Sequence, residues 1–253
     1  DDRPDYEEKL RWVCHNIHLG KDQLWDELME FPSIQFGVEM AFLSLQSKSL
    51  FELFPSEFTE GKKNMLINGL VWMGEEQFMK TQIEEKLAQG FSCIKLKIGA
   101  IDFDKELGLL RFIRQNFDAK TIEIRVDANG AFNSNEALSK LNQLNEFELH
   151  SIEQPIKANQ IQEMKLLCHQ TPFPIALDEE LIGVFETEDK RKLLEEIQPQ
   201  YIILKPSLVG GFKGTLEWIS IAESLNIGWW ITSALESNIG LNAITQFTFT
   251  LNN

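Results

Sequence analysis

The 253-residue sequence predicts an α/β fold, a (β/α)7β TIM-like barrel with a partial helical domain at its N-terminus. Three observations carry this prediction. From about residue 64, short apolar runs alternate with longer stretches of helical composition, which is typical of βα units and a parallel sheet. The runs are apolar almost throughout, as expected for strands covered on both faces. The first run is followed by Trp72-Met73-Gly74-Glu75, which is not the glycine-rich phosphate loop of an open doubly wound sheet.

Residues 1–62 are expected to be mainly helical. Tyr6–Leu19 is amphipathic and is followed by a turn. In a second helix, apolar residues recur at helical spacing from Val38 to Leu45, and Ser33 is expected to be the N-cap. The barrel is then expected over residues 63–253.

The expected barrel consists of strands that alternate with helices. The strands are Met65–Trp72, Cys93–Ile98, Ile122–Asp127, His150–Glu153, Ile175–Asp178, Tyr201–Lys205, Gly228–Ile231 and, on a weaker pattern, Phe247–Leu251. The helices are Glu75–Ala88, Phe103–Phe117, Asn135–Leu144, Ile161–His169, Thr187–Glu196 and Leu216–Leu225.

The composition excludes several classes of protein. The 24 Lys and Arg residues face 39 Asp and Glu residues, which gives a net charge of −15. A chain this acidic lacks the basic field that attracts nucleic acid or an anionic membrane, so neither is expected as a partner. No apolar run approaches the roughly 20 residues that cross a bilayer. The first residues also lack the apolar core of a secretory signal.

The cysteines and histidines form no recognisable site. Cys14, Cys93 and Cys168 are odd in number and far apart, so reduced thiols in a cytoplasmic protein are expected. The four histidines lack the spacing of a metal-binding pattern. The oligomeric state is not readable from the sequence.

The candidate chemistry lies where the strands end. In Ile94-Lys95-Leu96-Lys97-Ile98, side chains two positions apart share one face of a strand, so Lys95 and Lys97 point the same way. Repulsion between two ammonium groups and partial burial both favour the neutral amine and lower the pKa of one of them. Such a lysine is a competent general base near neutral pH. The alternative for the pair alone is a strand whose lysines both face solvent.

Three acids end the next three expected strands. Asp127, Glu153 and Asp178 follow one another at intervals of about one βα unit, so the three carboxylates converge on one rim of the barrel. Converging carboxylates in an apolar setting need a cation among them. Oxygen ligands without Cys or His favour a hard divalent ion, Mg²⁺ or Mn²⁺. The alternative, N-caps for the following helices, explains any one acid but explains three in register poorly.

Lys205 ends the next expected strand and is expected almost opposite Lys97, with the metal site between them. A small-molecule substrate whose carboxylate binds the metal would present its α-carbon between the two amines. Removing the α-proton would leave an enediolate, which the metal and a cationic lysine would stabilise.

This order of residues resembles that of the enolase superfamily, in its muconate-lactonizing subgroup. The segments Ile67–Gly74 and Thr232–Ser237 look most like those of the o-succinylbenzoate synthase family of menaquinone biosynthesis. That family dehydrates 2-succinyl-6-hydroxy-2,4-cyclohexadiene-1-carboxylate to 2-succinylbenzoate, which implies that this protein is a carbon–oxygen lyase. Residues 34–45 resemble the helical part of the superfamily's capping domain. The resemblance therefore implies a helical part of a capping domain in residues 1–62, without its N-terminal sheet, and a catalytic barrel in residues 63–253.

The resemblance also implies a role for each site residue. Lys97 takes the α-proton and returns it to the leaving hydroxyl, Lys95 tunes Lys97, and Lys205 stays protonated and stabilises the intermediate. The implied Mg²⁺ ligands are Asp127, Glu153 and Asp178. The remaining implied residues are Asn129 and Glu179 around the metal ligands, and Ser233 and Leu235 at the substrate.

Other functions remain open at this point. N-acylamino-acid racemases and dipeptide epimerases use the same metal and lysine set with both lysines as bases, and muconate cycloisomerases use one lysine on a lactone. Dipeptide epimerases typically carry an Asp-x-Asp pair near the last strand, where this chain reads Thr250-Leu251-Asn252-Asn253. A catalytically silent barrel that serves as a scaffold is the alternative outside enzymes.

Overall fold

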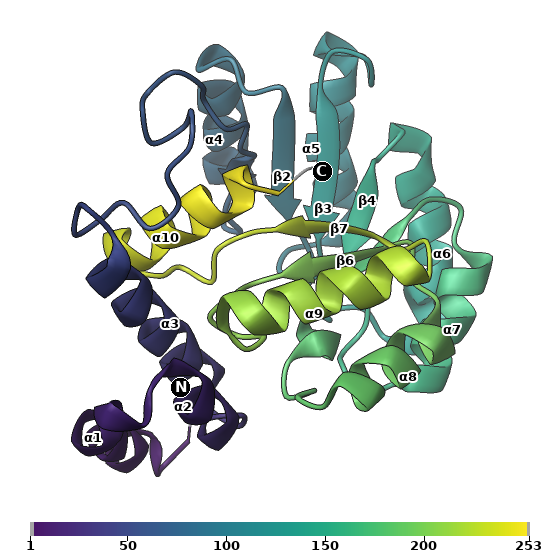
Figure 1. Ribbon diagram of the computed structural model, residues 1–253. Coiled ribbons are helices and arrows are strands. Elements are labelled where there is room, and N and C mark those ends of the chain that lie inside the picture. Colours follow the sequence, from purple (N-terminus) through teal and green to yellow (C-terminus); the bar gives the residue numbers. More distant parts are fainter. Residues whose placement is uncertain (1–2, 252–253) are drawn as a thin grey trace. The chain divides into compact units, whose positions relative to one another are not determined.

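The computed structural model describes residues 3–251 (Figure 1). Its strands follow one another in the sheet in the order of the sequence. Within these residues the sheet has seven strands in the order β1 to β7, and each pair from β1 to β6 is parallel. The strands are β1 (Gly69–Val71), β2 (Cys93–Lys97), β3 (Glu123–Asp127), β4 (Ser151–Glu153), β5 (Ile175–Leu177), β6 (Tyr201–Leu204) and β7 (Gly228–Ile231).

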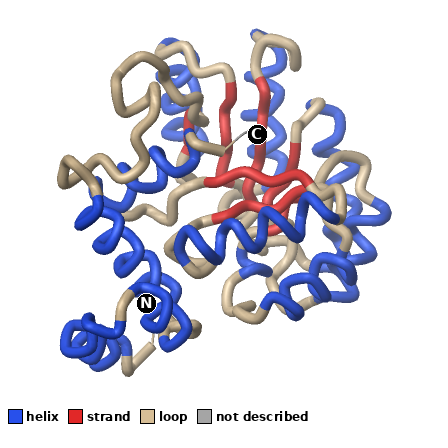
Figure 2. The backbone as a smooth tube through the Cα atoms, in the orientation of Figure 1, coloured by secondary structure: helices blue, strands red, loops and turns tan. Residues whose placement is uncertain are grey.

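Along the sequence, helices precede the first strand, connect successive strands and follow the last one (Figure 2). They are α1 (Tyr6–Asn16), α2 (Lys21–Glu27), α3 (Pro32–Gln46), α4 (Glu76–Ala88), α5 (Phe103–Asn116), α6 (Ser134–Leu144), α7 (Ile161–Gln170), α8 (Thr187–Ile197), α9 (Gly211–Ser224) and α10 (Asn238–Phe249). Short 3₁₀ helices lie at Ile17–Leu19, Asn145–Phe147 and Glu179–Leu181. None of the helices in the described part of the chain has both the length and the apolar character needed to cross a membrane.

The chain divides into two compact units that are interleaved along the sequence. The first unit contains the residues up to 65, residues 181–192 and the residues from 203 onward. The second unit contains residues 66–180 and 193–202. The predicted division of the chain at residues 62 and 63 stays a prediction.

In the second unit, strand alternation separates a core face from a polar face. Ile94 and Leu96 of β2 are fully buried, whereas Lys95 and Lys97 lie on the other face and are half-buried. This is the period-two pattern of a strand. Helices α4 and α5 lie beside β2 and β3 (Figure 1) and bury apolar residues such as Ile83. The lysines therefore leave the strand on a common face, as predicted.

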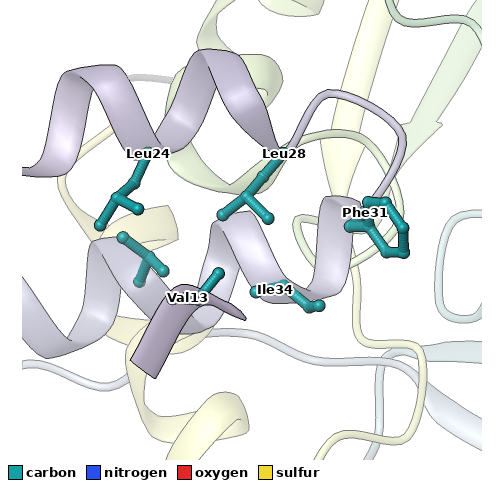
Figure 3. Close-up of a cluster of buried hydrophobic side chains, with 6 residues drawn as sticks. Val13, Leu24, Leu28, Phe31 and Ile34 are labelled. Carbon is teal, nitrogen blue, oxygen red and sulfur yellow. The ribbon is translucent and has the colours of Figure 1, made fainter. Parts of the chain in front are cut away.

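In the first unit, the N-terminal helices enclose a core of their own. Val13, Leu24, Leu28, Phe31 and Ile34 pack together with Val38 (Figure 3). Burying a Leu, Ile or Phe side chain contributes roughly 1.5–3 kcal/mol each. This cluster therefore holds α1, α2 and α3 together.

A second apolar cluster in the first unit joins α3 to the last two helices. It contains Phe36, Phe212, Ala243, Ile244 and Phe247. The spacing of its last three members is that of one face of a helix. Ala243, Ile244 and Phe247 therefore lie on the face of α10 that packs against Phe36 and Phe212.

A buried amide completes this region. Gln246 of α10 accepts hydrogen bonds from the backbone N–H groups of Leu53 (2.8 Å) and Phe54 (3.1 Å). Its nitrogen donates to the carbonyl of Phe51 (2.7 Å). Helix α10 therefore fixes a segment that is far from it in the sequence.

Two predictions about individual elements are wrong. The weak strand at Phe247–Leu251 is absent, because α10 continues through Phe249 and its apolar side chains pack on Phe36 and Phe212. Ser33 is not an N-cap: Phe31 holds that position, since Pro32 occupies the first helical turn, where its missing N–H costs nothing. The Ser33 hydroxyl instead donates to the Tyr6 hydroxyl at 3.2 Å.

Candidate active site

Neighbouring strand ends bring the predicted site residues of the second unit together. The parallel register pairs Lys97 of β2 with Asp127 of β3, and Asp127 with Glu153 of β4. Asp178 follows directly after β5. Asp127, Glu153 and Asp178 are 0 %, 2 % and 2 % exposed. Three carboxylates therefore lie buried at one end of the sheet.

Two lysines face these carboxylates. The Lys97 ammonium donates to Asp127 Oδ2 at 2.5 Å, and the Lys95 ammonium lies 3.0 Å from the same oxygen. Lys95 also contacts Glu153 Oε2. In the structure, the ammonium groups thus supply the opposite charge that the buried acids need.

Burial and charge set the pKa values of the cluster. Burial raises the pKa of Glu153 well above its usual range, and the charges of Asp127 and Asp178 add to this although Lys95 opposes it. For Asp127 the effect of burial is outweighed by Lys95 and Lys97, so its pKa is lowered. Asp127 and Asp178 therefore both act on the pKa of Glu153, as expected for carboxylates that converge on one end of the sheet.

The pKa of Lys95 moves in the direction opposite to that expected from a pair of lysines alone. Burial lowers this pKa, but the adjacent carboxylates of Glu153 and Asp127 outweigh burial, and the pKa is raised. Lys95 is thus held as an ammonium in this arrangement.

Asn129 and Glu179 extend the cluster. Asn129 Oδ1 accepts a hydrogen bond from Lys97 at 2.7 Å, and its amide nitrogen donates to Glu179 Oε1 at 2.9 Å. Its backbone N–H donates to Asp127 Oδ1 at 3.0 Å. Asn129 has φ +43°, a conformation that non-glycine residues adopt rarely and that is frequent at functional sites. The structure therefore brings Asn129 and Glu179 next to the lysines and acids.

The carboxylates fit a hard divalent cation. Glu153 Oε2 is paired with the Lys95 ammonium, but the buried oxygens Glu153 Oε1 and Glu179 Oε2 accept no hydrogen bond. Buried carboxylate oxygens without donors are costly unless a cation supplies the missing partner. Among residues 3–251, no three acidic, His or Cys side chains already stand in metal-binding geometry. In this structure the Lys95 ammonium contacts both Asp127 and Glu153.

The other predicted site residues belong to the first unit. Lys205 follows directly after β6 and is half-buried. Ser233 and Leu235 lie in the loop between β7 and α10, where Leu235 has φ +65° and is 73 % exposed. The predicted position of Lys205 opposite Lys97 stays a prediction.

One acid shapes that loop. Glu236 accepts a hydrogen bond from the backbone N–H of Ala234 at 2.8 Å and another from the hydroxyl of Ser207. Ser207 lies two residues after Lys205, so Glu236 ties together the loops that follow β6 and β7.

The sequence reasoning missed two buried polar residues of the second unit, Gln154 and Glu180. Both are buried and hydrogen-bonded to each other at 3.0 Å. Each lies one or two residues after a predicted metal ligand. A glutamine directly after the strand-end acid Glu153 was the available signal.

Comparison with known proteins identifies the family. The protein-family model described as "Enolase C-terminal domain-like" matches residues 79–253 of this sequence. The chain belongs to the enolase C-terminal domain-like family. The predicted resemblance to the enolase superfamily is confirmed, and so is the predicted fold class of an α/β barrel with a parallel sheet. Enolase superfamily members depend on a divalent metal.

Individual members of this family are similar over most of the chain. It is 56 % identical to an o-succinylbenzoate synthase of Desulfotalea psychrophila, covering 86 % of this chain and 59 % of that protein. It is 31 % identical to an N-succinylamino acid racemase of Thermus thermophilus, covering 83 % of this chain and 54 % of that protein. The crystal structure of MenC from Desulfotalea psychrophila superimposes with a TM-score of 0.82 at 46 % identity, covering 99 % of this chain and 72 % of that one. The chain thus spans little more than half the length of these curated relatives.

Proposed function

We propose that the protein is an o-succinylbenzoate synthase, a hydro-lyase that converts 2-succinyl-6-hydroxy-2,4-cyclohexadiene-1-carboxylate to 2-succinylbenzoate in menaquinone biosynthesis. The supporting observation is the 56 % identity to the Desulfotalea psychrophila o-succinylbenzoate synthase over 218 residues. The buried carboxylates and the two lysines beside them are the groups that this chemistry needs. The substrate is accordingly a small carboxylic acid.

Lys97 is the proposed base. Its amine takes the α-proton, the electron pair left behind forms the new ring double bond, and the hydroxyl leaves as water with the proton that Lys97 returns. Taking a proton requires the neutral amine, so Lys97 must first give up the proton that it donates to Asp127 at 2.5 Å. Asn129, which accepts from Lys97 at 2.7 Å, would keep the amine in place during this change.

Asp127, Glu153 and Asp178 are the proposed ligands of Mg²⁺ or Mn²⁺. When bound, the cation supplies positive charge beside the substrate carboxylate, where negative charge accumulates as the α-proton leaves. Lys95, now paired with Asp127 and Glu153, would have to leave Glu153 to free its oxygens. Lys95 would then stand beside Lys97 as a neighbouring positive charge, which is the tuning role proposed for it.

The remaining roles concern the first unit. Lys205 is proposed to stay protonated and to stabilise the negative charge of the intermediate. The loop that contains Ser233 and Leu235 is proposed to offer backbone N–H groups to the second carboxylate of the substrate. The predicted capping helices in residues 1–62, the catalytic barrel in residues 63–253 and the cytoplasmic location are kept as parts of this proposal.

The test is an assay of 2-succinylbenzoate formation, with the unstable substrate generated in situ, in the presence and absence of a chelator. We expect Lys97→Ala to lower kcat at least 100-fold, because general acid–base catalysis typically contributes 10²–10⁴-fold. Lys165→Ala is the matched control, since Lys165 of the same unit forms only a partly exposed ion pair with Glu196. Full activity of Lys97→Ala would contradict the proposed role of Lys97.

A second candidate function is the racemisation of N-acylamino acids. The 31 % identity to the Thermus thermophilus N-succinylamino acid racemase favours it. Racemisation needs both lysines as bases, whereas dehydration needs one base and one positive charge. Lys205→Arg should therefore retain part of the dehydratase activity and abolish racemase turnover in at least one direction. Measuring both reactions on the parent and this variant separates the two functions.

A further inference from the structure

Gln154 is the buried residue that directly follows Glu153, and it uses its whole hydrogen-bonding capacity. It is 0 % exposed. Its side-chain oxygen accepts from the backbone N–H groups of Asp178 (3.2 Å) and Glu180 (3.3 Å). Its side-chain nitrogen donates to the carbonyl of Ile156 and to Glu180 Oε2, both at 3.0 Å. A carboxamide can accept two hydrogen bonds and donate two, so none of its capacity is left over.

The backbone of Gln154 makes further connections to the neighbouring strand ends. Its N–H donates to the carbonyl of Ala176 in β5 at 2.9 Å, and its carbonyl accepts from Gly130, after β3, at 2.7 Å. Its φ is +38°, a strained value for a residue with a side chain. Such strain persists only where surrounding contacts hold it, and it is concentrated at functional sites.

The partner of Gln154 is itself held in place. Glu180 is buried, and its other oxygen, Oε1, accepts from the backbone N–H of Asn159 at 2.8 Å. Gln154 and Glu180 thus link the loops after β4 and β5 through their side chains and backbone. The acids that end or follow these strands are Glu153 and Asp178.

We propose that Gln154 is a positioning residue for the divalent-cation site: its carboxamide holds the backbone of Asp178 at a fixed place beside Glu153. This inference rests on the proposed cation site. The backbone N–H of Asp178 fixes the point from which its carboxylate leaves the chain. Residues that orient metal ligands without touching the metal typically change its affinity 10–100-fold when they are replaced.

The same unit offers a matched control at the other end of β5. Gln200 accepts from the backbone N–H of Ile175 at 2.9 Å and donates to the carbonyl of Cys168 at 3.1 Å. Ile175 is the first residue of β5, whereas Asp178 follows its last. Replacing Gln200 therefore removes an amide that braces the same strand but lies away from the carboxylates.

The experiment measures Mn²⁺ affinity of the 253-residue chain by electron paramagnetic resonance titration, alongside urea unfolding. Methionine keeps the unbranched shape of glutamine without its hydrogen bonds, so the variants are Gln154→Met and Gln200→Met. We expect both to unfold at lower urea concentration. We expect the Mn²⁺ Kd to rise at least tenfold for Gln154→Met and to stay within twofold of the parent for Gln200→Met.

A gentler variant covers the case in which Gln154→Met does not fold. Gln154→Asn keeps a carboxamide but is one methylene too short for the contacts to Asp178 and Glu180, and we expect a rise in Kd of at least threefold. Unchanged Mn²⁺ affinity in the Gln154 variants would overturn this inference and leave the cation site standing. A parent chain that binds no Mn²⁺ would overturn the proposed cation site, and this inference with it.

Discussion

Glu39 of α3 is a buried acid whose protonation should couple stability to pH. It is 5 % exposed, and its carboxylate accepts hydrogen bonds from the backbone N–H groups of Phe212 and Lys213 in the first turn of α9. Burial raises its pKa from 4.5 to about 7, although these two N–H groups act in the opposite direction. The perturbation to make is Glu39→Gln, which removes the titration and keeps the shape of the side chain.

The sign and size of the effect follow from this shift. Because the folded protein binds the proton of Glu39 more tightly than the unfolded chain does, the contribution of this group to stability is fully present below about pH 4.5. It is lost as the pH rises through about 7. One pKa unit corresponds to about 1.36 kcal/mol. Between pH 5.5 and pH 8, linkage then predicts a loss of about 2 kcal/mol from Glu39.

The assay is urea unfolding of the parent and of Glu39→Gln at pH 5.5 and pH 8. Other groups titrate as well, so the quantity to compare is the difference between the two proteins at each pH. We expect the parent to gain about 2 kcal/mol over the variant on going from pH 8 to pH 5.5. Glu84→Gln, at an exposed position of α4, controls for the loss of one carboxylate. Parallel shifts of the parent and Glu39→Gln would refute the reasoning.

Two further predictions concern the cation site and a glycine. Millimolar Mg²⁺ should raise the Tm of the parent but not that of Asp127→Asn, because a ligand at 100 times its Kd stabilises the folded state by about 2.7 kcal/mol. Scanning fluorimetry with and without EDTA measures the two Tm shifts. Equal shifts in the parent and the variant would count against the cation site. Gly211→Ala should cost about 2 kcal/mol or more in urea unfolding, because its Cβ would lie 2.1 Å from Glu39 Oε2 at a φ of +70°. Gly183→Ala, at φ +85° with nothing within 4 Å, isolates the cost of φ alone, and an equal loss there would show that the contact with Glu39 is unimportant.

The strand ends were predictable because strand geometry constrains them strongly. An apolar run with period-two alternation fixes the face of each side chain, so Lys95 and Lys97 could be placed on one face from the sequence. Parallel neighbours with one βα unit between them then bring their carboxyl ends to one edge. This is why Asp127 and Glu153, about one such unit apart, could be placed side by side.

Other features depend on contacts that a linear sequence does not display. Phe247 and its neighbours have strand-like composition, but packing against Phe36 and Phe212 favours the helix over local propensity. The apolar pattern predicted that this helix begins at Leu216, but α9 begins at Gly211. Its first turn is stabilised by Glu39, which accepts a hydrogen bond from the backbone N–H of Phe212. The side-chain bonds of Gln154 to Asp178 and Glu180 cross between two strands, and no spacing rule predicts them.

The sequence distance between Glu39 and Phe212 matters while the chain is being made. The two residues are 173 positions apart, and Phe54 and Gln246 are 192 apart. At roughly 5–20 residues per second, a ribosome takes about 9–35 s to add the first of these intervals. During that time Glu39 and Phe36 of α3 have been made, but the helix α9 that they contact in the folded chain has not. Until Phe212 has been made, Phe36 lacks the partner that it contacts in the folded chain, and slower translation would lengthen that interval.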